Sequence, residues 1–575
     1  MKKKFKRASR PKSRSGCRTC KIRRVKCDES RPYCERCVKF GTTCDGYPTA
    51  SPSFASVRQN ILPKGLEPYT PPIRYVPSTR RFTSVHESRF FTLYMHETAP
   101  QISGPFQTSL WARLIPQACE AEPFIRQLVI ATAALSHACA EEFSEHGDLW
   151  AANRRLTYSY ALKHYEKALR GMRDAILKSK YNLRNALLAC LLVFCFESLH
   201  GDAKSTANHA ASGLALLQEW MAERTVSKAV VVPRSGQFEG LDVEILHAFA
   251  GLDVQVLFFR GAPSARQHLR FLEQFSDTVK TQMPSKFETL EDVKAYWFLV
   301  QRRNYHFNIV AKDGLANPNA DENWRTQERD HGLEKIEQWD VDNLYKPPIS
   351  LTHESNTLAL KAQMESYRED IRRWSRAAAS VFTRVERKGT QEDKVLMQLL
   401  NIQAYLNHVQ LAAIFFTSEV EYDAFLPAYT AIVAFSEAVH PYLSTVLNTK
   451  SGQSKATGGL FRFNCGIVCP LSFVGFRCRN SHMRSRAIAL LNKSLLREGI
   501  WDSLTVGCLA SCIQRDEEEG MDSSGFIPED KRVVLTLCDV DLKNGSARLE
   551  FTSKGTNGER EFRTETIEWR FGIEH

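Results

Sequence analysis

The sequence is short of long hydrophobic runs. The longest covers residues 186–196 and ends before Glu197, so it is too short to cross a bilayer as a helix. The N-terminus reads Met-Lys-Lys-Lys-Phe-Lys-Arg with no apolar stretch behind it, and we therefore expect no secretory signal. These absences argue against a membrane protein and favour a reducing compartment, in which cysteines stay unpaired.

Catalytic motifs are also lacking. The sequence contains no nucleophile elbow, phosphate-binding loop, HExxH motif or dinucleotide fingerprint. Glu244, His247 and Asp253 fall together on one expected helix, where packing or surface roles account for them. We therefore expect a protein that is not an enzyme, with an enzyme carrying a basic appendage as the alternative.

Net charge is absent from most of the chain. Residues 1–50 hold 16 lysines and arginines against 4 acidic residues, and this difference equals the whole net charge of +12. The rest of the chain holds 61 charges of each sign. A positive excess confined to one short segment suits binding to a polyanion such as nucleic acid.

Six cysteines occupy this basic segment in the pattern C-x2-C-x6-C-x6-C-x2-C-x6-C, whose second half repeats the first. They are Cys17, Cys20, Cys27, Cys34, Cys37 and Cys44. Two tetrahedral zinc ions need eight ligand positions, and six thiolates supply eight only if two of them bridge both metals. Disulfides, for which six cysteines allow 15 pairings, and a zinc site without a nucleic-acid role are the alternatives.

The spacing, with Lys-Ile-Arg-Arg-Val-Lys between Cys20 and Cys27 and Pro32 before Cys34, resembles the fungal six-cysteine binuclear zinc cluster. That cluster is the DNA-binding module of transcription factors of the galactose-regulator type, and the resemblance covers about residues 14–47. It implies two zinc ions (Zn2+) per chain, with Cys17 and Cys34 as bridges. It also implies that Cys20 and Cys27 complete one zinc site, and Cys37 and Cys44 the other.

The resemblance further implies a short basic helix in the major groove of double-stranded DNA, which we expect after Cys20. The family's base-reading side chain falls at Arg24, against a CGG triplet. The family more often has lysine at this position, but arginine can also bind guanine O6 and N7. The side chains expected to contact phosphates, which position the module without specifying sequence, are Arg18, Lys21, Arg23, Lys26, Arg36 and Lys39.

Composition and periodicity divide the chain into five parts. Residues 1–14 form a basic arm and candidate nuclear localisation signal, 15–47 the zinc-cluster module, and 48–85 a proline-rich linker. The prolines leave no apolar heptad for the dimerising coiled coil that the family often has here, so dimerisation stays open. Residues 86–530 have helical periodicity, and 531–575 alternate as a C-terminal antiparallel β segment with a turn at Asn544-Gly545. The predicted fold class is mainly α.

Four patterns within the helical region make specific predictions. Residues 183–199 are apolar almost all round and predict a buried helix. A stripe from Val395 to Phe416 is typical of core, with a partner-facing coiled coil as the alternative. The acidic run at 516–519 predicts a solvated loop. The ten remaining cysteines predict small buried hydrophobic residues, and we decline a metal site at Cys465-x3-Cys469 or Cys508-x3-Cys512.

Two further segments, residues 196–202 and 497–502, resemble parts of the helical regulatory domain that follows this cluster in many fungal factors. The sequence therefore predicts a nuclear, DNA-binding regulator of RNA polymerase II transcription, more typically an activator, that reads CGG-containing promoter sites. Control of metabolic or secondary-metabolite genes is typical of the family, and transcription co-regulators are expected partners. The alternative is a chromatin or scaffold protein that binds DNA without sequence preference.

Overall fold

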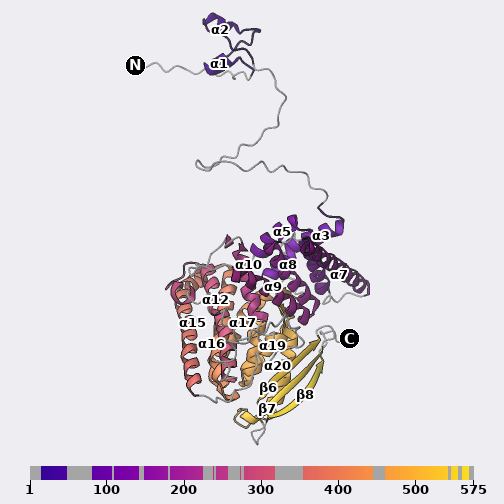
Figure 1. Ribbon diagram of the computed structural model, residues 1–575, viewed down its shortest axis with the longest axis vertical. Helices are drawn as coiled ribbons and strands as arrows, with labels where there is room; N and C mark the ends of the chain where they lie inside the picture. Colours follow the sequence, from indigo (N-terminus) through magenta and orange to yellow (C-terminus); the bar gives the residue numbers. More distant parts are fainter. Residues whose placement is uncertain are drawn as a thin grey trace. The chain divides into compact units, whose positions relative to one another are not determined.

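The computed structural model describes residues 15–47, 81–106, 109–141, 148–178, 182–223, 237–238, 241–256, 268, 272, 278–316, 354–444, 460–541, 546–554 and 560–568. The chain forms two compact units, Met1–Thr79 and Arg80–His575 (Figure 1). The basic arm at 1–14 lies outside the described residues. So do residues 48–80 of the linker, where we expect no coiled coil.

The described part of the first unit contains two short helices, α1 (Arg18–Ile22) and α2 (Glu35–Lys39). Each helix begins directly after a cysteine, and their starts are separated by one period of the sequence repeat. The buried hydrophobic cluster consists of the six cysteines, with Tyr47 packed against them. So small a segment cannot bury enough apolar surface to fold by itself, and another source of stability is needed.

The second unit is mainly helical, as predicted (Figure 1). Its α-helices are α3 (Val85–Leu93), α4 (Ala99–Ser103), α5 (Ile115–Ala121), α6 (Pro123–Glu141), α7 (Asp148–Leu177), α8 (Leu183–His200), α9 (Ala203–Glu223), α10 (Val243–Val256), α12 (Leu290–Ala316), α15 (Glu354–Lys388), α16 (Gln391–Ala412), α17 (Leu426–Leu443), α18 (Val468–Arg477), α19 (Ser481–Lys493) and α20 (Ser503–Glu518). Short π- or 3₁₀-helical turns are η1 (Tyr94–Thr98), η2 (Leu110–Leu114), η3 (Thr278–Gln282), η4 (Ala413–Phe415), η5 (Glu419–Phe425) and η6 (Glu529–Lys531).

Helix α8 lies in the core, as its sequence predicts. The Asn182 side chain caps its first turn, and Gly201 ends it in the left-handed conformation at φ 83°. Among the described helices, α8 alone is long and apolar enough to cross a membrane, but 67% of it is buried inside the protein. This burial is what a core helix of a globular unit requires.

The apolar stripe of α16 is also core. Val395, Leu399, Ile402 and Leu406 are at most 2% exposed. A capping box between Thr390 and Asp393 starts the helix, and α16 packs against α12, α15 and α17. The core interpretation of this stripe is therefore confirmed, and α16 has no face left for a partner helix along these residues.

The C-terminal segment forms an antiparallel sheet of three strands in the order β6 (Val533–Asp541), β7 (Ser546–Lys554) and β8 (Arg560–Glu568). Leu535 pairs with Phe551, and a register shift follows between Leu535 and Leu537, so the simple alternation that the sequence suggests is broken by a bulge. The predicted Asn544-Gly545 turn lies outside the described residues. Two smaller sheets are β1 (Gln237–Phe238) with β2 (Leu241–Asp242), and β3 (Leu460–Arg462) with β4 (Leu496–Glu498) and β5 (Trp501–Asp502).

The two segments that resemble a regulatory domain, residues 196–202 and 497–502, contact each other. The Arg497 guanidinium donates to the carbonyl oxygens of Ser198 and Leu199 at 3.3 and 3.1 Å, and the Ser198 hydroxyl donates to the carbonyl of Gly499. Gly499 has φ 57°, and a Cβ there would lie 1.7 Å from Gln255 Oε1. These residues thus join the end of α8 to the β4–β5 turn, which is a packing role.

The expectation of a solvated loop at 516–519 is wrong. Glu517 lies in the last turn of helix α20 with no exposure, and its carboxylate binds Arg479 at 2.8 Å and Arg484 at 2.6 Å. It also accepts the backbone N–H of Val533 at 2.7 Å. Two buried arginines supply the positive charge that lets a carboxylate enter the core, and both lie too far away in sequence to be seen in the acidic run.

Candidate metal centre and nucleic-acid interface

Cys17 and Cys34 start the two helices of the first unit. Each is the N-cap of its helix, and each sulfur accepts the backbone N–H of the cysteine three residues later, at 3.4 Å from Cys20 and 3.3 Å from Cys37. This is the geometry of a serine or aspartate cap with sulfur as the acceptor. The x2 spacing therefore lets the first cysteine of each pair cap a helix. It also turns both sulfurs of the pair inward.

The six sulfurs gather into two groups of four that share Cys17 and Cys34. One group adds Cys20 and Cys27, the other adds Cys37 and Cys44, and within each group all sulfurs lie within 4.8 Å of one another. All six side chains are buried. In the described part of the chain, no other cluster of histidine, cysteine or acidic side chains could hold a metal ion.

The sulfur–sulfur distances fit tetrahedral zinc. Zinc–sulfur bonds of about 2.3 Å place two ligands of one tetrahedron about 3.8 Å apart. The measured distances are 3.6 Å for Cys17–Cys34, 3.8 Å for Cys17–Cys37 and 3.7 Å for Cys20–Cys34. Cys20 and Cys37 also lie 3.7 Å apart, closer than expected for ligands at opposite ends of two tetrahedra that share an edge. The donor set as a whole is that of a closed thiolate site.

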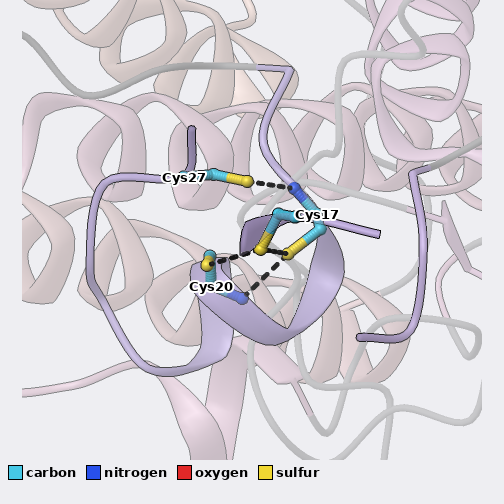
Figure 2. Close-up of side chains that lie close together, drawn as sticks. Cys17, Cys20 and Cys27 are labelled. Carbon is cyan, nitrogen blue, oxygen red and sulfur yellow. Dashed lines mark hydrogen bonds between the residues drawn. The ribbon is translucent and has the colours of Figure 1, made fainter. Parts of the chain in front are cut away.

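The electrostatics of the cluster favour a cation. Burial raises the pKa of the Cys17, Cys20 and Cys34 thiols, because desolvation disfavours the charged thiolate. At Cys27, burial is outweighed by the N–H groups of Cys17 and Glu29, each 3.4 Å from the sulfur, and the pKa falls to about 7. A bound dication would ionise all six thiols. Figure 2 shows Cys17, Cys20 and Cys27, with the contact from the Cys17 N–H to the Cys27 sulfur and that from the Cys20 N–H to the Cys17 sulfur.

Two aspartates that sequence reasoning missed brace the cluster. Asp28 accepts the backbone N–H groups of Ser30, Glu35 and Arg36 at 2.8–3.1 Å. The Ser30 side chain first, and then these backbone bonds, hold the pKa of the Asp28 carboxyl well below its usual range. Asp45 is its counterpart in the second half of the repeat and accepts the Thr19 hydroxyl at 2.9 Å. The repeat in the sequence could have revealed this pair, because both aspartates directly follow the last cysteine of their half.

We expected a helix after Cys20, but helix α1 contains Cys20. It runs over Arg18–Ile22, with Arg23 as its C-cap. The capping role of Cys17 explains the earlier start. Arg24, at φ 56°, leaves the helical conformation. Lys21 therefore lies on the helix, whereas Arg24 lies in the turn beyond it and Lys26 in the segment after that turn.

The seven predicted DNA-binding residues divide by what their side chains contact. Arg18, Lys21, Arg24 and Lys26 are exposed, and no side-chain partner is found for them among the described residues. Arg23 is half-buried, with its guanidinium 3.5 Å from the centre of the Phe40 ring. Arg36 donates to the carbonyl oxygen of Lys26 at 2.7 Å, and Lys39 pairs with Glu35 at 3.0 Å on the surface. The first four are the cations that the protein leaves available.

The other candidate residues have structural roles. Asp253 is buried and binds Arg302 at 2.6 Å and His306 at 3.0 Å. Glu244 instead binds Arg113 at 3.0 Å, and burial lowers the pKa of His247 to about 4. Among the remaining cysteines, Cys119, Cys195, Cys469 and Cys478 are buried and the other described side chains are partly buried. These residues do not converge on one reacting centre.

Two protein-family models match the chain. The model described as the fungal Zn(2)-Cys(6) binuclear cluster domain matches residues 15–53, where the six sulfurs lie. The chain carries a zinc-cluster domain. Such a domain holds two zinc ions. The model described as the fungal specific transcription factor domain matches residues 89–249 of the helical unit. Both are domains of transcription factors rather than of enzymes.

Curated proteins similar to the chain are regulators. The aspercryptin biosynthesis cluster-specific transcription regulator atnN of Emericella nidulans is 28% identical over 44% of this chain and 40% of its own length. Transcription regulator lscL of Purpureocillium lilacinum is 26% identical over 40% of this chain and 55% of its own. The Zn(2)-C6 fungal-type transcription factor afumD of Aspergillus fumigatus is 31% identical over 23% and 35%. The chain thus spans about half the length of these relatives or less. No solved structure matches it.

Proposed function

We propose that this protein is a nuclear, sequence-specific DNA-binding regulator of transcription. Its zinc-cluster domain would read a CGG triplet in the major groove, and its helical unit would carry the regulatory functions. The presence of both domains in one chain supports this role. The zero net charge beyond residue 50 supports DNA contact through residues 1–50, which include the basic arm and the zinc-cluster domain, because the excess of positive charge lies there.

The proposed metal ligands are the six clustered cysteines. Cys17 and Cys34, which belong to both groups of four sulfurs, would bridge the two zinc ions. Cys20 with Cys27, and Cys37 with Cys44, would complete the two sites. Zinc with all positions filled by protein is structural, so the metals would supply the folding free energy that this small segment lacks.

The observation that carries the proposed DNA reading is the backbone at Arg24. The repeat pairs Arg24 with Gly41, and both have positive φ, at 56° and 76°. Glycine adopts this conformation at little cost, whereas arginine is strained there. A strained residue whose side chain is exposed and has no partner among the described residues indicates a functional constraint. We infer that Arg24 is kept for its side chain, which would bind guanine O6 and N7.

The other exposed cations fit contacts to the phosphate backbone. Arg18 and Lys21 lie on α1, and Lys26 lies beyond it, so all three can surround the base-reading turn. Arg36 and Lys39 would add phosphate contacts beside their internal bonds, and Arg23 would contribute mainly by its stacking on Phe40. Phosphate contacts raise affinity for every sequence and do not select one.

Binding of the zinc-loaded chain to a CGG duplex and to a scrambled duplex, across salt concentrations, tests the proposal. Tighter binding to CGG supports base reading, and equal binding to both duplexes would support the nonspecific chromatin or scaffold role instead. Replacing Lys21 with alanine should weaken both complexes alike and reduce the salt slope by about one. Replacing Glu35 with alanine, which removes the surface partner of Lys39, frees that cation and should strengthen both complexes alike.

The similarity to atnN, named as a regulator specific for a biosynthesis cluster, supports a biosynthetic gene set as the target. We also propose that the protein activates transcription, which is the more usual effect of such factors. Transcript levels of genes adjacent to the coding locus, compared between deletion and overexpression strains, test both points. A fall on deletion and a rise on overexpression are expected.

A further inference from the structure

Helix α7 carries a local excess of positive charge. Residues 51–575 as a whole are neutral, but positions 155–178, on α7 and directly after it, hold six basic residues against two acidic ones. All eight side chains are exposed. The six basic residues are Arg155, Lys163, Lys167, Arg170, Arg173 and Lys178. An exposed surface with an excess of one sign attracts a partner of the opposite sign.

Most of these cations are not neutralised within the protein. Lys167 lies 3.8 Å from the buried Glu87 of α3, and Arg170 pairs with Glu166 of its own helix at 2.5 Å. Both members of the second pair are more than 60% exposed, and such surface pairs contribute little. The other four cations have no side-chain partner among the residues that the structure describes: Arg155, Lys163, Arg173 and Lys178. Positive charge is therefore left at the surface for a partner.

An apolar line borders the cations. Leu162, Leu169 and Ile176 recur at the heptad interval and therefore follow one side of the helix; they are 37%, 37% and 57% exposed. The line flanks the buried face of α7, which includes Tyr165 and Ala168. In Figure 1, α7 runs along the edge of the helical unit. The exposed surface of α7 is thus apolar along one margin and mainly basic over the rest.

We propose that α7 is a docking surface for an acidic amphipathic helix of a partner protein. The apolar residues of that helix cover Leu162, Leu169 and Ile176, and its carboxylates pair with the basic side of α7. Two helices packed side by side stay in contact along a seven-residue repeat, which is the interval of these three residues. The partner is therefore recognised by leucine or isoleucine at every seventh position, with glutamate or aspartate along one flank.

Charge complementarity, together with the apolar line, selects this occupant. DNA would neutralise the cations but would leave the three apolar side chains in water. An uncharged apolar helix would cover the apolar line but would desolvate the cations beside it without pairing them, which is costly. An acidic amphipathic helix satisfies both parts of the surface. The apolar line is about 21 Å long, so the contact is small and the complex weak.

Fluorescence anisotropy of labelled synthetic helical peptides with the full zinc-loaded chain, in the absence of DNA, tests the surface independently of the proposed DNA reading. The first peptide has leucine at every seventh position and glutamates along one flank. The second has lysine in place of each glutamate, and the third has serine in place of each leucine. The first peptide should bind, with an affinity that falls as salt is raised. The lysine peptide should not bind, and the serine peptide should bind about tenfold more weakly or less.

Variants of α7 separate this surface from the basic residues 1–50, which also attract an acidic peptide. Lys163→Glu combined with Arg173→Glu should weaken binding of the first peptide about tenfold or more. The matched control, Arg387→Glu combined with Lys388→Glu, reverses two exposed cations at the end of α15 and should bind as the unaltered chain does. Circular dichroism of both variants establishes that they are folded.

The apolar line is tested by Leu169→Ser, which should also weaken binding of the first peptide, against the control Leu358→Ser at a 68% exposed leucine of α15. Equal binding of the first peptide by the α7 variants and their controls would overturn the proposal. Undiminished binding of the serine peptide would overturn the amphipathic partner. A scrambled DNA duplex should bind equally to the α7 charge variant and its control; a loss on the duplex without a loss on the peptide would make α7 a DNA contact instead.

Discussion

Replacing Arg24 with glycine should separate the folding of the zinc-cluster domain from its reading of DNA. Arg24 has φ 56°, and its counterpart Gly41 has φ 76°. A non-glycine residue in this conformation costs about 1–2 kcal/mol, and glycine loses about 0.5–1 kcal/mol more than alanine in chain entropy on folding. The two effects nearly cancel. Because the Arg24 side chain has no internal partner among the described residues, we expect stability to change by less than about 1 kcal/mol.

DNA binding should respond differently. Loss of a bidentate arginine–guanine contact costs about 1–3 kcal/mol of discrimination, which is roughly 5- to 150-fold in Kd. Fluorescence anisotropy with CGG and scrambled duplexes at one salt concentration measures this, while zinc content and zinc release on chelation report the fold. The loss should appear on CGG and be nearly absent on the scrambled duplex.

Gly41→Ala is the matched control. A Cβ at Gly41 meets no atom within 4 Å, so only the backbone conformation is strained, at about 1 kcal/mol. This variant should release zinc more readily and keep its preference for CGG. Equal losses of Arg24→Gly on both duplexes would refute the base-reading role. Loss of zinc from Arg24→Gly would refute the argument from strain.

Three other predictions concern the cluster and the helical unit. Cys34→Ser should remove both zinc ions and DNA binding, because Cys34 belongs to both groups of sulfurs; two zinc ions per chain by mass spectrometry would exclude bridging by this residue. Glu517→Ala should destabilise the helical unit by about 3–5 kcal/mol in urea unfolding, since Arg479 and Arg484 are left buried without their counter-charge; a loss under about 1 kcal/mol would contradict this. Burial alone would raise the pKa of Glu517, but these two arginines lower it. Its stabilising contribution is therefore complete above the unfolded pKa of about 4.3 and is lost as pH falls below that value through the folded pKa, and the Ala variant should lack this part of the acid sensitivity.

The cysteine spacing predicted much of the candidate site. Ligand spacing is a local property, and the x2 gap lets each first cysteine cap a helix and turn its partner inward. The burial of α8 was also predictable from local sequence, because one continuous segment is apolar on nearly all sides. The assignment of individual ligands and DNA contacts is a prediction that zinc and DNA measurements must test.

Features that depend on distant partners or on turn conformation were out of reach of the sequence. The run at 516–519 looks solvated because nothing near it in sequence neutralises it, yet Arg479 and Arg484 reach Glu517 from the segment after α18 and from α19. The stacking of Arg23 on Phe40 likewise joins the two halves of the repeat and removes one of the seven expected cations from the exposed set. The positive φ of Arg24 could have been suspected only by aligning it with Gly41.

The most direct test of the central claim is selection of DNA by the full zinc-loaded chain from a random library, followed by sequencing of what is retained. The account predicts enrichment of CGG that is lost in Arg24→Gly. Absence of any enriched sequence, with two zinc ions bound per chain, would contradict it.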